Sequence, residues 1–363
     1  MTRQIKRIGL LTGGGDCPGL NAVIRAVTKC AIVDHGLEVV GIADGFLGLI
    51  EDRVGSLGMN DVSDILTRGG TILGANNRID TTRYPVVEHG ETVYRDVTGQ
   101  AVARLHQHKI DALVVIGGDG TMWVANQFVQ HGVNCIGVPK TIDNDLWGTD
   151  VTFGFASAVS VASDALDRIH TTAASHHRVM IVEVMGRNAG WIALHAGIAS
   201  GADIILIPEI AFDVNAICEF IKQRERRGRR FTIICCSEGA RPRDGEQTFE
   251  LDHTRPDPVR LGGISRVIAP QIEKLTGDEA RTTILGHVQR GGTPVPEDRV
   301  LGTRFGHAAV DALMRGRCNQ LVAMQHNQMT AVDLQSIAGK QRIVPADHPL
   351  IEVAKAVGTS FGC

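Results

Sequence analysis

Two short acidic segments carry the residue types best suited to chemistry. They read Gly117-Gly118-Asp119-Gly120-Thr121 and Thr141-Ile142-Asp143-Asn144-Asp145. The first offers glycine amides and a carboxylate, which suit the binding of phosphates and a divalent metal ion. The second offers a hydroxyl group and two carboxylates, enough for a general base and a metal contact. Together the two segments indicate a protein that transfers a phosphoryl group.

Each segment follows an apolar run that is typical of a buried strand, at residues 112–116 and 135–138. Because the carboxyl ends of parallel strands open on a common crevice, the two segments are expected to meet there. For the first segment a simple glycine turn is the alternative, and for the second an Asn/Asp turn with solvated carboxylates. The buried strands that precede them favour ligand binding in both cases.

A third strand, Arg7–Thr12, precedes a glycine-rich loop at residues 13–19 and a helix that runs through residue 31. Glycines let a backbone approach a polyphosphate, and the first amides of a helix add partial positive charge. The loop lacks the third glycine of the dinucleotide-binding fingerprint, where Pro18 stands, and it lacks the Gly-Lys-Ser/Thr of a Walker A loop. Taken alone, it is open to two interpretations, phosphate binding and a tight structural turn.

Strand-like and helix-like runs alternate along nearly the whole chain, which is the pattern of parallel βαβ units. Further strands are predicted at residues 37–43, 178–184, 203–207 and 231–236, and a helix is predicted with Val159, Ala162, Leu166 and Ile169 on one face. A chain of 363 residues exceeds what one hydrophobic core usually serves. Two α/β domains, joined near residues 152–154, are therefore expected.

The composition is that of an ordinary globular protein, with 43% apolar and 21% charged residues. The net charge of −3, with both signs interspersed, gives no electrostatic footprint for a nucleic acid or a membrane surface. No apolar run suits a signal peptide or a membrane-spanning helix, so a cytoplasmic protein is expected. The eight cysteines form no Cys-x-x-Cys pair, which argues against a zinc site and a disulfide framework and favours reduced cysteines.

The ordered set of motifs resembles the 6-phosphofructokinase family from about residue 8 to about residue 325. Beside the segments above, the chain carries four further runs of that family, at residues 68–74 (RGGTILG), 183–187 (EVMGR), 237–239 (SEG) and 285–292 (LGHVQRGG). The resemblance implies an α/β fold of two Rossmann-like three-layer domains with mainly parallel sheets and an active site in the cleft between them. It implies a phosphoryl-donor domain of residues 1–154 plus 290–337 and a fructose 6-phosphate domain of residues 155–289 plus 338–363.

The resemblance also implies a role for each matching residue. Asp143 would be the general base for the 1-hydroxyl of fructose 6-phosphate, and Thr141 would contact the transferred phosphate. Arg187 would stabilise charge in the transition state. Asp119 and Asp145 would hold Mg²⁺. These roles suit the chemistry, because phosphoryl transfer depends on positioning and on charge stabilisation.

Matching positions imply two binding surfaces and a quaternary arrangement. The positions for the ATP donor are Gly15, Phe46, Arg78, Gly118, Asp119, Gly120, Thr121 and Lys140. Those for the sugar are Thr141, Asp143, Met185, Gly186, Arg187 and Glu238, with His287 and Arg290 on its 6-phosphate. Arg178 and Arg281 match arginines that reach this phosphate from a neighbouring subunit. The resemblance therefore implies a homo-oligomer, with a tetramer as the expected form, whose arginine forks suit a phosphate dianion.

The phosphoryl donor depends on two positions that disagree. ATP-dependent relatives carry glycine at the position of Gly120, where an aspartate would crowd and repel a nucleotide phosphate. Pyrophosphate-dependent relatives resemble this chain at Lys140. We expect ATP, because an aspartate excludes the nucleotide whereas a lysine only adds attraction; pyrophosphate is the alternative. Asn77 stands where many relatives place an arginine, and we expect Arg78 to replace it.

Two further interpretations stay open. Arg25, Lys29 and the basic turn at residues 227–230 match an effector site of allosteric relatives. Phe231 replaces the histidine of that site, and a solvated basic turn that closes a helix is the favoured interpretation of residues 227–230. A non-catalytic sensor of nucleotide or sugar phosphate is a remote alternative, against which the intact Asp119, Asp143, Asp145 and Arg187 argue.

Overall fold

The computed structural model describes residues 5–77, 79–243, 245, 247–251 and 259–363. The chain divides into two compact units. The first unit comprises Met1–Ile142, Leu146–Gly154 and Arg290–Gln341, and the second comprises Asp143–Asp145, Phe155–Gln289 and Arg342–Cys363. The limits drawn from the sequence differ in two places: residues 338–341 group with the first unit, and Asp143–Asp145 group with the second.

The first unit is built on a seven-stranded sheet in the order β15-β14-β7-β6-β1-β2-β3. Its strands are β1 (Arg7–Thr12), β2 (Glu38–Ile42), β3 (Val54–Ser56), β6 (Ala112–Gly117), β7 (Asn134–Pro139), β14 (Gln320–Gln325) and β15 (Gln328–Asp333). The edge strands β3 and β15 run antiparallel to their neighbours, and the five between them are parallel. Since β1 pairs with β2 on one side and with β6 on the other, the topology switches direction between β1 and β6, where α/β proteins bind ligands.

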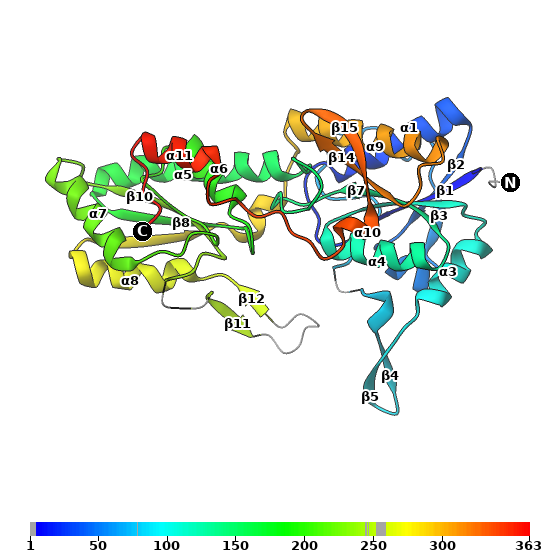
Figure 1. Cartoon of the computed structure of the whole chain (residues 1–363), viewed down its shortest axis with the longest axis horizontal. Helices are drawn as coiled ribbons and strands as arrows, with labels where there is room; N and C mark the ends of the chain where they lie inside the picture. The colour runs from blue at the N-terminus through cyan, green and yellow to red at the C-terminus, as the bar shows by residue number, and fades with distance from the viewer. Residues whose placement is uncertain (1–4, 78, 244, 246, 252–258) are drawn as a thin grey trace. The chain divides into compact units, whose positions relative to one another are not determined.

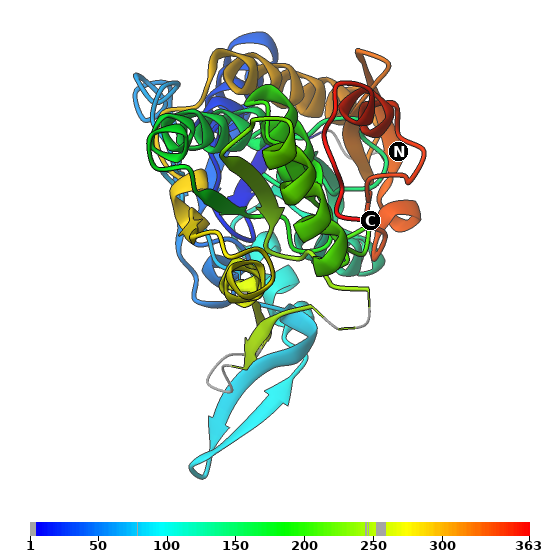
Figure 2. The same cartoon turned by 90° about the vertical axis from the view of Figure 1, so that its left-hand side faces the viewer.

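Helices cover both faces of this sheet (Figure 1). Helices α1 (Leu20–His35) and α9 (Pro296–Met314) pack together on one face, and α3 (Thr98–Gln107) and α4 (Asp119–Gln130), with the short helices α2 (Leu47–Ile50) and α10 (Leu334–Ile337), lie on the other. The first pair packs closely because Gly306 has no side chain: a Cβ there would stand 2.6 Å from the Cβ of Ala26. After the 3₁₀ turn η1 (Thr81–Arg83), the hairpin β4 (Tyr84–Glu88) and β5 (Glu91–Arg95) projects from this unit (Figure 2).

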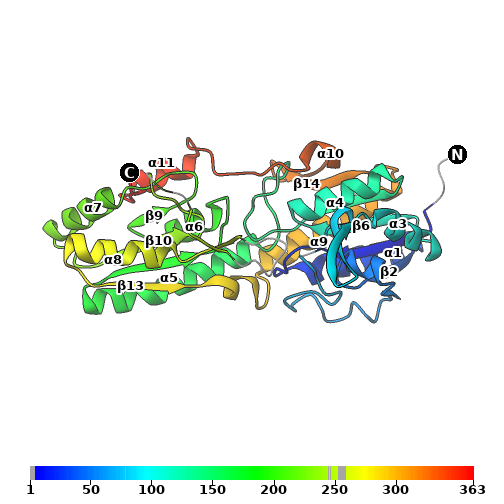
Figure 3. The ribbon, with the colours of Figure 1, turned by 90° about the horizontal axis from the view of Figure 1, so that it is seen from below.

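The second unit has a parallel four-stranded sheet in the order β13-β8-β10-β9. Its strands are β8 (Val179–Val184), β9 (Ile204–Leu206), β10 (Thr232–Ser237) and β13 (Ala280–Ile284). Helices α5 (Phe155–His176) and α6 (Trp191–Ala199) cover one face, and α7 (Val214–Arg226) and α8 (Ile264–Thr276) cover the other (Figure 3). A two-stranded ribbon, β11 (Phe249–Leu251) with β12 (Val259–Leu261), the 3₁₀ turn η2 (Gly286–Arg290) and α11 (Pro349–Ala356) complete the unit, η2 ending at Arg290 in the first unit. The expected three-layer α/β architecture with mainly parallel sheets is confirmed.

The cysteines are free thiols, most of them buried. Burial raises the pKa of Cys17 and Cys235 to about 12, so both stay protonated at neutral pH. Within the described part of the chain, no helix combines the length and the apolar character that crossing a membrane requires.

Candidate active site

The loops that follow β1 and β6 are packed against each other through Thr121. The Gly13 amide donates to the carbonyl of Ile116 at 2.8 Å. Thr121, in the first turn of α4 and only 8% exposed, fills the space beside both loops. A Cβ on Gly13 would stand 2.5 Å from its Cγ2, and one on Gly117 would stand 2.3 Å from its Cβ. Both glycines are therefore required by close packing, and the Thr121 side chain spaces the two loops.

The amino end of α4 presents a carboxylate beside open space. Gly118 is the N-cap, and Asp119 is the first helical residue, where a negative charge is favoured by the helix dipole. Asp119 Oδ1 accepts a hydrogen bond from the Gly339 amide at 3.2 Å. A Cβ on Gly120 would meet no described atom within 4 Å. The segment thus combines a fixed carboxylate with room for a ligand at the next residue.

Lys140 connects the end of β7 to both glycine loops. Its side chain is almost fully buried, with 4% exposed, and its ammonium donates to the carbonyl of Gly15. Its own amide donates to the carbonyl of Gly117 at 3.0 Å. The positive charge therefore lies inside the residue 13–19 loop, where it holds the loop in place.

Arg290 lies against the same loop from the other end of the sequence. Its Nη1 donates to the carbonyl of Asp16 at 3.1 Å, and a Cβ on Gly15 would stand 3.0 Å from that nitrogen. The first unit thus holds two cationic side chains, Lys140 and Arg290, on a loop rich in glycine amides. Such a loop suits an anion.

Two residues predicted to lie beside the nucleotide, Phe46 and Arg78, gain no support from the structure. Phe46 is 4% exposed and belongs to the core, where its ring lies 5.0 Å from that of Phe128. Little of its ring surface is left for a ligand, so its place beside a nucleotide is not supported by its surroundings. Arg78 lies outside the described residues, and its neighbour Asn77 is exposed.

The segment from Thr141 to Asp145 alternates in burial. Thr141, Asp143 and Asp145 are partly exposed, whereas the intervening Ile142 and Asn144 are buried. Asn144 adopts a left-handed conformation with φ of 52°, which asparagine tolerates better than most residues. The alternation leaves Thr141, Asp143 and Asp145 partly exposed while Ile142 and Asn144 anchor the backbone between them. Asp143 Oδ1 is itself shielded from solvent.

The loops that follow β8 and β10 pack closely in the second unit. A Cβ on Gly239 would stand 2.0 Å from the carbonyl oxygen of Arg187, and Ser237 Oγ donates to the carbonyl of Gly186 at 2.6 Å. Met185 is nearly buried, whereas Arg187 is exposed and Glu238 partly exposed. Since β8 and β10 are parallel neighbours, these residues lie at one edge of the sheet, where ligands bind in α/β folds.

Two residues that the sequence did not single out support this edge, the buried Gln289 and the partly buried Glu209. Gln289 is fully buried, and its Oε1 accepts from the Met185 amide at 2.9 Å. The Glu209 carboxylate accepts from the amides of Gly190 at 3.0 Å and Val344 at 2.8 Å. Burial raises the pKa of Glu209. Gln289 falls within the run at residues 285–292, which was a usable signal, whereas Glu209 belongs to no motif.

Arg178 and Arg281 share one carboxylate. Arg178 Nε donates to Glu279 Oε2 at 2.5 Å, and Arg281 Nη2 donates to Glu279 Oε1. The hydrogen bond from Arg178 lowers the pKa of Glu279. The structure therefore brings together the two arginines that were predicted to serve a neighbouring subunit. His287 is exposed on η2 of the same unit.

Comparisons with known proteins agree with this architecture. A family model described as phosphofructokinase matches residues 7–313. The chain belongs to the phosphofructokinase family. Among its relatives is a Clostridium perfringens protein named ATP-dependent 6-phosphofructokinase 2, 50% identical over 99% of this chain and 100% of that protein. Another, from Amycolatopsis mediterranei, is named pyrophosphate–fructose 6-phosphate 1-phosphotransferase and is 48% identical over 94% of this chain and 97% of its own length.

A solved structure shares the fold of this chain. The T-state phosphofructokinase of Pichia pastoris is 31% identical, with a TM-score of 0.78 over 98% of this chain. This chain spans only 37% of that longer chain. Relatives of similar identity are thus named for two different phosphoryl donors, so overall similarity does not decide the donor and particular residues must.

The oxygen donors expected to hold a metal ion suit magnesium. Mg²⁺ is usually bound by one or two carboxylates together with substrate phosphates and water, and Asp119 and Asp145 supply carboxylates of that kind. Among the residues that the structure describes, no group of three or more His, Cys, Asp or Glu side chains is arranged to hold a metal ion.

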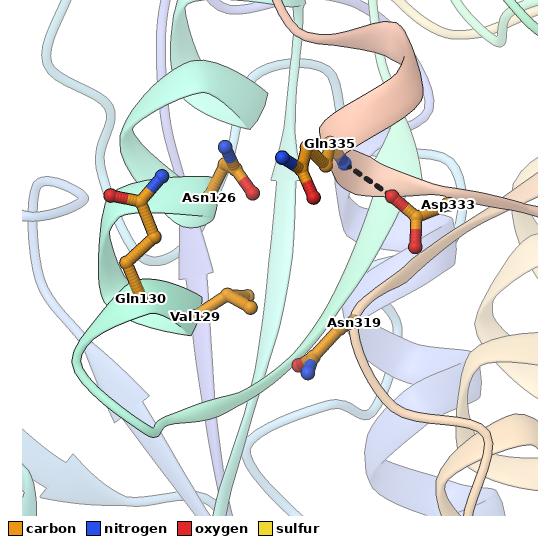
Figure 4. Close-up of a pocket in the computed structure, with 6 residues that line it drawn as sticks. All are labelled: Asn126, Val129, Gln130, Asn319, Asp333 and Gln335. Carbon is orange, nitrogen blue, oxygen red and sulfur yellow. Dashed lines mark hydrogen bonds between the residues drawn. The ribbon is translucent and has the colours of Figure 1, made fainter.

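A separate hollow of about 240 Å³ lies at the other end of α4 (Figure 4). It is lined by Asn126, Val129, Gln130, Asn319, Asp333 and Gln335. The Asp333 carboxylate caps α10 by accepting from the Gln335 amide at 2.7 Å. Because its one charged group already caps a helix, this hollow offers no chemistry comparable to the loops at the amino end of α4.

Proposed function

We propose that this phosphofructokinase transfers the γ-phosphoryl group of ATP to the 1-hydroxyl of fructose 6-phosphate in the cytoplasm, forming fructose 1,6-bisphosphate. The observation that carries the proposal is the alternation along Thr141, Asp143 and Asp145, which are partly exposed on a backbone anchored by buried residues. Relatives that are 50% and 48% identical to this chain are named ATP-dependent 6-phosphofructokinases.

In the proposed mechanism, the 1-hydroxyl oxygen attacks the γ-phosphorus, the bond to the leaving ADP oxygen breaks, and the hydroxyl proton passes to Asp143. Thr141 contacts the transferred phosphate, and the exposed Arg187 stabilises the charge that develops on it. Asp119 and Asp145 would hold Mg²⁺, which neutralises phosphate charge when bound. No covalent enzyme intermediate is required, because positioning and charge stabilisation supply the rate.

The sugar is assigned to the packed loops after β8 and β10. Met185, Gly186 and Glu238 line it, and His287 is assigned to its 6-phosphate. Arg290 is assigned to the same phosphate only because it matches the family position, since its guanidinium lies against the residue 13–19 loop, which is assigned to the donor. Arg178 and Arg281 complete this phosphate site from a neighbouring subunit in a homotetramer. Their common attachment to Glu279 supports this assignment, since it gathers two guanidinium groups that remain partly exposed and can bind a dianion together.

The donor is assigned to the glycine loops of the first unit, with Gly15, Gly118, Asp119, Gly120, Thr121 and Lys140. Two observations favour ATP. The space at Gly120 is open, so a nucleotide phosphate meets no side chain there. The Lys140 ammonium is bound to the Gly15 carbonyl, so this lysine has a structural function that does not require pyrophosphate.

The pyrophosphate-dependent reaction is the second candidate, favoured by the Amycolatopsis relative at 48% identity. The test is formation of fructose 1,6-bisphosphate from fructose 6-phosphate and Mg²⁺ with ATP and pyrophosphate in parallel. We expect turnover with ATP and little with pyrophosphate. Turnover with pyrophosphate alone would overturn the donor assignment, and tight binding of both substrates without turnover would support a non-catalytic sensor.

A further inference from the structure

A short segment near the carboxyl terminus, residues 342–344, holds the Asp143–Asp145 turn through hydrogen bonds. The Arg342 amide donates to the carbonyl of Asp145 at 2.7 Å, and Arg342 Nη1 donates to the carbonyl of Asn144 at 3.1 Å. Both bonds lie within the second unit. One residue thus contacts two consecutive carbonyl groups of the turn that carries the proposed base, from almost two hundred positions further along the chain.

Arg342 is itself fixed by α6. Its guanidinium lies over the indole of Trp191, with Cζ 4.1 Å from the ring centroid, and the Trp191 Nε1 donates to the Arg342 carbonyl at 3.1 Å. Trp191 is the first residue of α6 and is 2% exposed. Because the ring is buried and the contact is stabilised by cation–π attraction, the guanidinium is aimed rather than free to rotate.

A second anchor lies two residues further on. The Val344 amide donates to the Glu209 carboxylate at 2.8 Å, and this carboxylate also accepts from Gly190, the N-cap of α6. The segment is therefore attached to α6 at Arg342, through Trp191, and again at Val344, through Glu209 and Gly190. It also lies beyond residue 313, where the match to the family model ends.

The centre of the turn has a backbone conformation that is uncommon for a residue other than glycine. Asn144 has φ of 52° and is 4% exposed, and a left-handed residue persists only where its surroundings enforce it. General-base catalysis requires the carboxylate within hydrogen-bond reach of the hydroxyl. A displacement of about 1 Å can cost on the order of a hundredfold in rate.

We propose that Arg342 is a positioning residue that holds the Asp143–Asp145 turn in its reactive geometry. The inference rests on the phosphoryl transfer proposed above. Arg342 contacts neither the sugar nor the donor. Its side chain acts through the carbonyl group of Asn144, whereas its bond to the carbonyl of Asp145 comes from the backbone amide, which Arg342→Ala retains.

The experiment compares Arg342→Ala with Arg342→Lys and with Lys355→Ala as a matched control. Lys355, in α11, is also a cation over an aromatic ring: its Nζ lies 5.8 Å from the ring centroid of Phe361. No contact joins Lys355 to the Asp143–Asp145 turn. We expect Arg342→Ala to lower kcat about a hundredfold while KM for fructose 6-phosphate and ATP changes less than about twofold. Arg342→Lys should keep only part of the wild-type kcat, because lysine lacks the planar fork of arginine. Methylguanidinium added to Arg342→Ala should restore more of kcat than this. Lys355→Ala should have the kcat of the wild type.

Hydrogen exchange of the peptide that contains residues 141–146 gives a readout that needs no activity. We expect faster exchange there in Arg342→Ala and no change in Lys355→Ala. Wild-type kcat and unchanged exchange in Arg342→Ala would overturn the inference, as would a loss of kcat that follows only the folded fraction and is not rescued. If the alanine variant does not fold, Arg342→Lys and Trp191→Phe provide the same comparison. If the wild type itself shows no turnover, the proposed function fails, and exchange still decides whether Arg342 holds the turn.

Discussion

The ammonium group of Lys140 donates a hydrogen bond to the backbone carbonyl of Gly15. Lys140 follows β7 and Gly15 follows β1, and β6 lies between these two strands in the sheet. The same lysine binds the end of β6 through its amide and Gly117. One buried side chain thus connects three strand ends at the switch point of the sheet, and it does so on the loops assigned to the donor.

Removing this lysine should loosen the donor loops without changing the donor. We expect Lys140→Met to lower kcat/KM for ATP by about ten- to a hundredfold, because a hydrogen bond from a charged group is lost, and to lower the melting temperature. Steady-state kinetics with both donors measures this, with Lys355→Met as the control. A variant that keeps wild-type ATP kinetics and loses only a pyrophosphate activity would show instead that Lys140 contacts the donor.

Gly120 should determine which donor enters. We expect Gly120→Asp to raise KM for ATP at least about tenfold, because a carboxylate near a nucleotide phosphate is repelled. Gly120→Ala should fold and work nearly as the wild type does, since a Cβ at this position meets no described atom within 4 Å. Equal ATP kinetics in Gly120→Asp and Gly120→Ala would contradict the donor assignment.

Gly13 should tolerate no side chain while Thr121 is present. We expect Gly13→Ala to destabilise the protein by about 1–3 kcal/mol, because its Cβ would stand 2.5 Å from Thr121 Cγ2. In a Thr121→Ala background the same change should cost clearly less, which a double-mutant comparison of thermal unfolding would show. Additive effects of the two substitutions would mean that Thr121 does not space the loops.

His195 should make the second unit sensitive to acid. The ring packs against Phe155 at 5.1 Å, and burial, followed by the nearby His348 and Arg342, lowers the pKa of His195. Below about pH 6.5 the unfolded chain binds a proton that the folded protein does not accept. Stability is therefore present above that pH and is lost as the pH falls through the lowered pKa, by at most about 1.4 kcal/mol per pH unit for this group.

Melting temperatures between pH 5 and pH 7.5 test this expectation. His195→Leu should flatten the acid side of the profile, although His348, whose pKa is also lowered by burial, leaves part of the slope. Replacement of the exposed His106 by glutamine is the control and should leave the profile as it is in the wild type. Parallel profiles for His195→Leu and the wild type would exclude His195 as the source.

The sequence predicted the elements because their signals are local. β1 occupies the expected residues Arg7–Thr12, β6 is one residue longer than predicted at its carboxyl end, and β7 is one residue longer at each end. Periodic apolar residues reveal such elements wherever burial repeats along the chain. The glycine loops were also recognisable, since glycine at the end of a strand is typical of a tight turn or of a backbone that approaches a ligand closely.

Contacts between distant segments were not predictable in the same way. The burial of Phe46 could not be predicted from its neighbours in the sequence, because it depends on Phe128, which α4 places against its ring. Arg342 and Glu209 belong to no motif, and what they contact depends on how the carboxyl-terminal segment packs on α6. Tertiary packing, rather than any local pattern, decides which carbonyl or amide a distant side chain reaches.

The most direct test of the account is the turnover of Asp143→Ser beside the wild type, with binding of fructose 6-phosphate measured separately. If Asp143 takes the proton of the 1-hydroxyl, kcat with ATP should fall by several orders of magnitude while the dissociation constant of the sugar changes little. Turnover near that of the wild type would remove Asp143 as the base and contradict the proposed mechanism.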